Sequence, residues 1–191
     1  VTIKVFDSEL DKHFLVELAM QQLTDDTWQI TKINNLKTLI NERDQALQNK
    51  LAELNAPVQK QIDDAVAVAP QKIFITSAPY SGVIRLLEAD IQLTNNAVKE
   101  LQYFTGVLEL YNADNELFYS GNFASSKDLA AKQAAVYKFN WELNPFLTDD
   151  AKVMNSDFSK VTWKASLSSL SFADGSTIEL LTQLPVKAAT K

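Results

Sequence analysis

The sequence contains no cysteine, which excludes disulfide bonds, thiolate zinc sites and cysteine nucleophiles. Histidine occurs once, at His13, so neither a multi-histidine metal site nor a Ser-His-Asp triad with a spare base can be assembled. We expect a structural or surface role for His13. The four glycines are scattered along the chain and cannot form a glycine-rich phosphate loop. The missing residue types therefore leave no recognisable catalytic set.

Positive charge is also sparse, because the 191 residues carry a formal net charge of −6 and arginine appears at Arg43 and Arg85 alone. An acidic surface repels phosphate backbones and anionic headgroups, which disfavours nucleic-acid binding and polybasic membrane docking. No apolar run approaches the roughly 20 residues that a membrane helix needs. The sequence thus predicts no cofactor, no nucleic-acid partner and no transmembrane segment.

Adjacent aspartates occur three times, at 25–26, 63–64 and 149–150. Calcium loops need several oxygen ligands around a turn glycine, and no Asp-x-Asp-x-Asp-Gly pattern is present. The first and third pairs follow a threonine, so we interpret them as helix caps near a positive dipole end. The second pair is interpreted as part of a polar helix face. Metal binding is therefore not predicted.

Residues 1–70 are predicted to form a helical region. An Asp-Ser pair at positions 7–8 is a helix N-cap signal, and it predicts a helix over residues 8–23. Apolar residues in that segment recur at helical spacing: Leu10, Phe14 and Leu18 on one line, and Val16, Met20 and Leu23 on another. Residues 1–6 alternate weakly, as a short strand or an ordered tail would. Residues 28–33 are β-rich and predict a short strand or turn.

A longer helix, or a helix pair, is predicted over residues 35–68, with Pro57 as a kink or a new first turn. Its apolar stripe consists of Leu36, Ile40, Leu47, Leu51 and Leu54. One interpretation packs this stripe against helix 8–23 and the β-region. The other makes it a coiled-coil seam for self-association or a protein partner, although Arg43 interrupts the seam. The five stripe residues are the candidate partner-binding residues.

After Pro70 the pattern changes to strands and turns, and residues 71–184 predict an antiparallel β-sandwich of two sheets. The strands are expected at 73–75, 85–95, 100–111, 117–119, 135–143, 161–167 and 177–181. A threonine-capped helical turn is expected over 148–154, and residues 185–191 are expected to be a frayed tail. A β-barrel remains an alternative. The fold class is therefore α+β, with a helical region followed by a sandwich.

One stretch resembles a known family. Residues 89–95 end a strand in Asn95, and residues 108–112 read Leu-Glu-Leu-Tyr-Asn before the turn at Asn115. This combination resembles the FxLYD and LEA14-like immunoglobulin-like domains that occur in bacterial envelope proteins. The resemblance covers residues 85–143 and implies an immunoglobulin-like sandwich and an envelope setting. The family shares no catalytic residue, and residues 1–70 match no family.

The leading functional prediction is a non-enzymatic protein of the bacterial cell envelope or periplasm that binds a partner or supports structure. Its binding surface would be the helical region or a sheet face. A carrier of a small apolar ligand, held between helix and sheet, is the alternative, and a hydrolase with two acids in a cleft is third. The chain begins at Val1 without methionine, so we expect a removed signal peptide, a lipidated cysteine or a trimmed tag upstream. A cytoplasmic location is the alternative.

Overall fold

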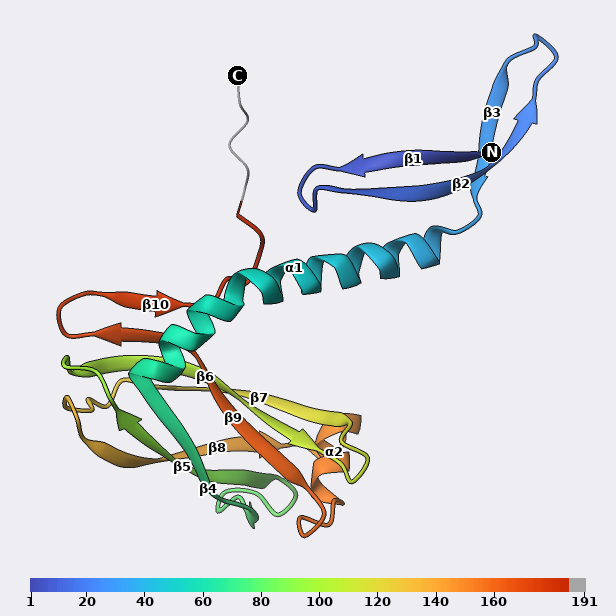
Figure 1. Ribbon diagram of the computed structural model, residues 1–191. Coiled ribbons are helices and arrows are strands. Elements are labelled where there is room, and N and C mark those ends of the chain that lie inside the picture. The colour runs from blue at the N-terminus through green and yellow to red at the C-terminus, as the bar shows by residue number, and fades with distance from the viewer. Residues whose placement is uncertain (186–191) are drawn as a thin grey trace. The chain divides into compact units, whose positions relative to one another are not determined.

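The computed structural model describes residues 1–185, and Figure 1 shows the order of the elements. The chain divides into two compact units. Unit 1 contains Val1–Ala56 together with the segment that begins at Leu181, and unit 2 contains Pro57–Leu180. Both are built mainly from antiparallel sheets. These limits differ from the predicted division at residue 70, because the long helix itself is shared between the units.

Unit 1 contains three strands where a helix was predicted. These are β1 (Thr2–Asp7), β2 (Lys12–Gln22) and β3 (Trp28–Ile33), hydrogen-bonded in the order β1-β2-β3. The prediction of a helix over residues 8–23, and of a helical region over all of residues 1–70, is therefore wrong. In β2 the side chains alternate between exposed and buried from His13 to Leu18, which is the period of a strand. The short strand expected at residues 28–33 is confirmed.

Helix α1 (Leu36–Ala65) confirms most of the long helix predicted over residues 35–68, but residues 66–68 are wrong, because they begin the strand Val66–Ser77. It is one continuous helix, with Pro57 inside it. Residues up to Ala56 belong to unit 1 and the remainder to unit 2. None of the helices in the described residues is long and apolar enough to cross a membrane.

Unit 2 consists of two antiparallel sheets. One has the order β4-β5-β8 and the other the order β10-β9-β6-β7. The strands are β4 (Val66–Ser77), β5 (Arg85–Asn95), β6 (Leu101–Tyr111), β7 (Leu117–Ser125), β8 (Ala134–Leu143), β9 (Thr162–Phe172) and β10 (Thr177–Glu179). Strand β6 pairs with β7 on one edge and β9 on the other, so it is the interior strand that its alternating pattern predicted.

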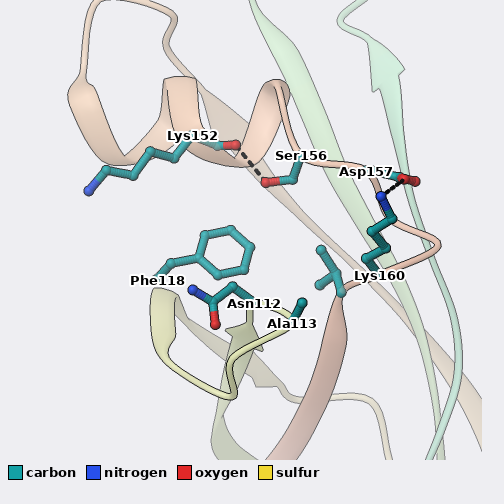
Figure 2. A pocket seen from close by; sticks show the side chains of 8 residues that line it. Asn112, Ala113, Phe118, Lys152, Ser156, Asp157 and Lys160 are labelled. Carbon is teal, nitrogen blue, oxygen red and sulfur yellow. Dashed lines mark hydrogen bonds and ion pairs between the residues drawn. The ribbon is translucent and has the colours of Figure 1, made fainter.

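The short helix α2 (Thr148–Met154) lies against β7 and β8 and buries Val153 completely. Figure 2 shows Phe118 of β7 next to this helix. A helix is present where the sequence predicted a helical turn, but the predicted threonine cap is wrong. The N-cap residue is Leu147, and no side chain forms a capping hydrogen bond there.

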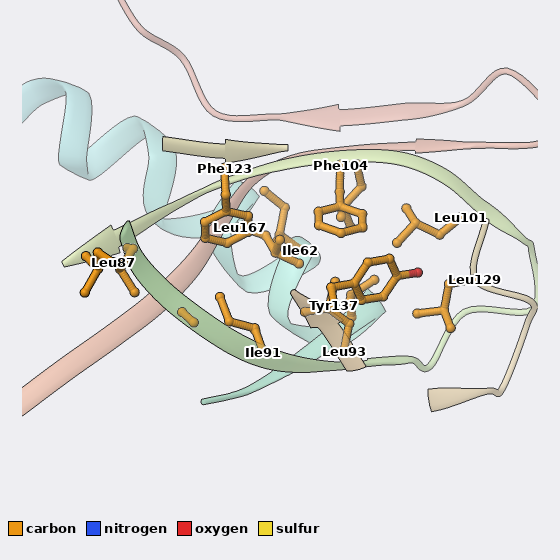
Figure 3. Close-up of a cluster of buried hydrophobic side chains, with 14 of the residues drawn as sticks. Ile62, Leu87, Ile91, Leu93, Leu101, Phe104, Phe123, Leu129, Tyr137 and Leu167 are labelled. Carbon is orange, nitrogen blue, oxygen red and sulfur yellow. The ribbon is translucent and has the colours of Figure 1, made fainter. Parts of the chain in front are cut away.

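The core of unit 2 lies between its two sheets, and 18 buried residues form one cluster. Figure 3 shows residues of both sheets and Ile62 of α1 pointing into this interior. Phe104 of β6 is fully buried and meets the ring of Tyr137 edge-on, with ring centroids 5.0 Å apart. Such edge-to-face contacts are favourable for aromatic pairs. Helix α1 therefore contributes its last turns to the core of unit 2.

Two glycines permit close approach within this core. A Cβ on Gly106 would collide with the Phe123 ring and with the carbonyl oxygen of Ser166. A Cβ on Gly121 would lie 2.7 Å from Nε1 of Trp141. Trp141 Nε1–H donates a hydrogen bond of 2.7 Å to the carbonyl of Asn122, which joins β8 to β7 across the side of the two sheets.

Candidate functional site

The five candidate partner-binding residues all lie in the part of α1 that belongs to unit 1. Leu36 and Ile40, in the first two turns, remain 48% and 49% exposed. The other three, Leu47, Leu51 and Leu54, are half-buried. The stripe therefore has an open N-terminal end and a more covered middle. Its use as a coiled-coil seam stays a prediction.

The buried face of strand β2 is directed toward α1. Phe14, Val16 and Leu18 share one face of β2 and are 6–8% exposed. Lys12 is on the same face and lines a cavity of about 230 Å³ whose other walls are residues of α1 between 46 and 53. This face of the sheet is therefore turned toward α1. Because residues 12–22 form a strand, the predicted packing of the stripe against a helix over residues 8–23 is wrong.

A polar anchor fixes the β1–β2 hairpin to α1. Arg43 donates hydrogen bonds from Nε to Asp7 Oδ2 at 2.8 Å and from Nη2 to Glu9 Oε2 at 2.9 Å. Asp7 Oδ1 also accepts the backbone N–H groups of Glu9 and Leu10. The Leu10 N–H, followed by the Arg43 guanidinium, lowers the pKa of the Asp7 carboxyl below its ordinary value. Arg43, which interrupted the apolar stripe in the sequence, therefore positions the sheet over the helix.

Asn35 fixes the start of the helix against the same sheet. Its side-chain Oδ1 accepts the Glu17 N–H at 3.0 Å, and its Nδ2 donates to the Leu15 carbonyl at 2.8 Å. The Asn35 side chain thus forms the two hydrogen bonds that a residue of a neighbouring strand would form with β2, on the edge away from β1. Leu36 and Ile40 follow directly, so their position relative to the sheet is fixed by Asn35 at one end and by Arg43 at the other.

Beside this anchored interface unit 1 leaves an apolar surface uncovered. Ile3 and Val5 of β1 pair with Val16 and Phe14, so they occupy the face that is turned toward α1. They are nevertheless 42% and 45% exposed, about as much as Leu36 and Ile40. We call these four residues, Ile3, Val5, Leu36 and Ile40, the open flank. Two of these residues lie on the edge strand β1 and two in the first turns of α1, and the sequence alone indicated only the two helical ones.

The opposite face of the sheet is also partly apolar. Phe6 and Leu15 are exposed there, and the Phe6 ring lies 5.0 Å from the His13 ring, measured between centroids. His13 therefore contacts an aromatic side chain, and among the described residues no cluster of three potential metal-ligating side chains exists. Farther along, Trp28 and Ile30 of β3 are exposed as well.

The surface hollows of unit 2 have a different character. Figure 2 shows one of about 430 Å³ beside α2, where Phe118 forms a wall. Its two lysines are both neutralised within the unit, because Lys152 pairs with Asp149 and Lys160 with Asp157. All four side chains of these ion pairs are more than half exposed to solvent.

A second hollow in unit 2, of about 580 Å³, lies between the last turn of α1 and the β9–β10 hairpin. Ala65, Ala97, Phe172 and Ile178 give it apolar walls. Lys99, at its rim, pairs with Asp174 at 2.5 Å, and this lysine lowers the pKa of the Asp174 carboxyl. Asn95 lies nearby and is buried. Its side-chain amide donates hydrogen bonds to the carbonyls of Lys99 and Leu129, and it thereby connects the loops around the hollow.

Comparisons with known proteins leave the family open: no protein-family model matches the chain, and no curated protein does. Three solved structures resemble it weakly. A structural genomics target named SoR45 covers 68% of this chain and 95% of its own length, with 12% identity and a TM-score of 0.38. A putative ApaA protein from Bordetella pertussis covers 63% and 86%, with 12% identity and a TM-score of 0.34. A protein from Archaeoglobus fulgidus covers 56% and 86%, with 13% identity and a TM-score of 0.33.

Proposed function

We propose that this protein is a non-enzymatic interaction protein whose unit 1 binds a protein partner. One observation carries the proposal. Within residues 1–40, ten large hydrophobic side chains are exposed, whereas three, on β2, are buried. Apolar surface of this extent is typical of interaction sites in soluble proteins. Leu36 and Ile40, the helical part of the open flank, lie between Asn35 and Arg43, which form hydrogen bonds to β2 and β1.

The proposal includes the finer description of unit 2 as an immunoglobulin-like sandwich that acts as a scaffold. Two facing antiparallel sheets and the resemblance of residues 85–143 to FxLYD and LEA14-like domains support it. The same resemblance supports a location in the bacterial envelope or periplasm, with a lipid anchor upstream; the cytoplasm is the alternative. The net charge of −6 supports a protein partner over a nucleic acid.

Site-specific photocrosslinking tests the proposal. The photoreactive amino acid p-benzoylphenylalanine replaces Ile40 in the full chain, produced in its native cells and irradiated there. We expect one discrete adduct, of a mass that identifies either a different protein or a second copy of this chain. The matched control carries the same amino acid in place of Val136 of β8, which is 48% exposed.

Adduct formation at Ile40 but not at Val136 supports the proposed function. Equal labelling at both positions, or no adduct at either Ile40 or Leu36, contradicts it. Circular dichroism of each variant confirms that the substitution has preserved the fold.

A carrier of a small apolar ligand is the second candidate, and the apolar hollow beside α1 in unit 2 favours it. Native mass spectrometry of the protein purified from its own cells tests this candidate. A bound mass that disappears when Ile178 is replaced by Asp supports a carrier. A mass equal to that of the chain alone contradicts it.

A further inference from the structure

The outer edge of β1 is an unpaired strand edge. The sheet order places β1 at the margin, and no other described segment hydrogen-bonds to its outer side. Val1 and Leu18 exchange both of their backbone hydrogen bonds, so the alternation of an antiparallel ladder turns the N–H and C=O groups of Thr2, Lys4 and Phe6 outward. Six consecutive residues of β1 pair with β2 without a bulge. This regular edge can accept a further strand.

The side chains beside this edge specify what such a strand would carry. A residue of the added strand opposite Lys4 lies on the same face as Lys4, away from α1. Within residues 1–185 Lys4 forms no ion pair, although Glu17 shares its face. An acidic residue is the complementary choice. The residues before and after it lie on the other face, beside Ile3 and Val5.

We propose that the open flank binds its partner by strand addition, taking an extended segment with the pattern apolar–acidic–apolar. This inference rests on the proposed function and names the partner's chemistry. Backbone hydrogen bonds to Thr2, Lys4 and Phe6 supply affinity, and the alternating side chains supply specificity. A second copy of β1 fits less well, because antiparallel pairing centred on Lys4 places two lysines opposite each other.

Other strand edges offer less. Strand β3 contains an irregularity opposite Ala19 and Met20, and such bulges protect an edge against pairing. Strand β8 is regular, but Val136 is its one exposed large hydrophobic residue. The β1 edge combines regular pairing with several exposed apolar residues and a lysine, Lys4, that forms no ion pair within residues 1–185.

The test uses the full chain, labelled with ¹⁵N, and two synthetic peptides. One is acetyl-Ser-Thr-Val-Glu-Val-Thr-Ser-amide and the other has lysine in place of glutamate. We expect the glutamate peptide to shift the amide signals of Thr2, Lys4 and Phe6 and to bind at least about fivefold more tightly than the lysine peptide. Lys4→Glu should reverse this preference. Lys32→Glu, which makes the same change of charge on β3, should not.

Lys4→Pro provides a second, backbone-based test. Because the Lys4 N–H points outward, proline there leaves the β1–β2 hydrogen bonds intact and is tolerated at a strand edge. We expect the signals of β2 to persist while peptide binding is lost. Equal binding of both peptides, or full binding to Lys4→Pro, overturns the inference. So does a shift of the β1 signals with protein concentration alone, together with a dimer in sedimentation.

The outcome separates this inference from the proposed function. If Lys4→Pro retains the photocrosslinked adduct at Ile40, the partner binds unit 1 by another mode, and strand addition fails while the function stands. If the protein with native Lys4 also gives no crosslinked adduct at Ile40, the proposed function fails as well.

Discussion

The two units of the chain bury their apolar side chains to very different degrees. In unit 2 both sheets and both helices contribute to one buried cluster of 18 residues. In unit 1 the buried hydrophobic residues are Phe14, Val16 and Leu18, on one face of one strand. Hydrophobic burial is the main favourable contribution to folding. Unit 2 thus has a large common core, whereas unit 1 leaves most of its large hydrophobic side chains at least partly exposed.

The largest effect is expected from Phe104→Ala, at the centre of unit 2. Removing this fully buried ring should lower the free energy of unfolding by about 3–5 kcal/mol. Urea denaturation followed by tryptophan fluorescence measures it. Leu15→Ala, at an exposed position in unit 1, is the control and should leave the unit 2 transition unchanged. A loss of less than about 1 kcal/mol would contradict the central place of Phe104.

Hydrogen exchange compares the units directly. We expect the amides of β2, from Phe14 to Leu18, to exchange more readily than those of β6. The free energy of the opening that exposes them should be lower by roughly 2 kcal/mol or more. The physical reason is the thin core of unit 1. Native-state exchange read by nuclear magnetic resonance measures both openings. Identical opening free energies for β2 and β6 would show that the units unfold as one.

A smaller loss is expected from Gly106→Ala. The added methyl group collides with the Phe123 ring and with backbone at Ser166, and overpacking of this kind costs about 1–3 kcal/mol. Gly82→Ala is the matched control, since nothing lies within 4 Å of the added carbon there. Thermal unfolding of both variants measures the difference. A Gly106→Ala protein as stable as Gly82→Ala would mean that β6 and β9 can separate at little cost.

The smallest effect concerns pH and unit 1. Because the folded pKa of Asp7 lies below its ordinary value of 3.8, its stabilising contribution is complete above that pH and is lost as the pH falls through the lowered pKa. The opening of the β1–β2 hairpin should therefore become easier in acid. Exchange rates of β2 amides between pH 5 and pH 2 measure this change. Asp7→Asn should make the opening of the hairpin less dependent on pH. An unchanged pH profile would mean that other groups cause the dependence.

Unit 2 was largely predictable from the sequence, and unit 1 was not. Strands with strict alternation over many residues, such as 85–95 and 101–111, match the structure closely. The helix α1 was found because its stripe extends over several turns. The immunoglobulin-like topology stays a prediction. Strand β2 is as long as β5 and β6, at 11 residues each, but its alternation of buried and exposed residues covers only its middle.

The wrong helix at residues 8–23 shows how two assignments compete. Phe14 and Leu18 are four residues apart, which fits a helix turn, but four is also a multiple of the strand period of two. Val16, between them, is buried as well, which decides for a strand. The cap signal was similarly ambiguous. Asp7 does accept N–H groups two and three residues ahead, as a helix N-cap would, but it does so in a hairpin turn.

The open flank was half visible in the sequence. Leu36 and Ile40 were named through their helical spacing, whereas Ile3 and Val5 were not, because their partners on β2 had been assigned to a helix. The role of Arg43 depends on contacts to residues more than 30 positions away. A single sequence contains no signal for such long-range pairing.

One further consequence concerns the order in which the protein is made. Two hydrogen bonds join the Asn55 side chain to the backbone of Leu181. Asn55 Nδ2 donates to the Leu181 carbonyl, and the Leu181 N–H donates to Asn55 Oδ1. Unit 2 is one continuous stretch of chain, whereas unit 1 needs residues from both sides of it. On the ribosome, where domains tend to fold as units during synthesis, the part that emerges first is therefore completed last. The contact between Asn55 and Leu181 can form only after unit 2 has been translated.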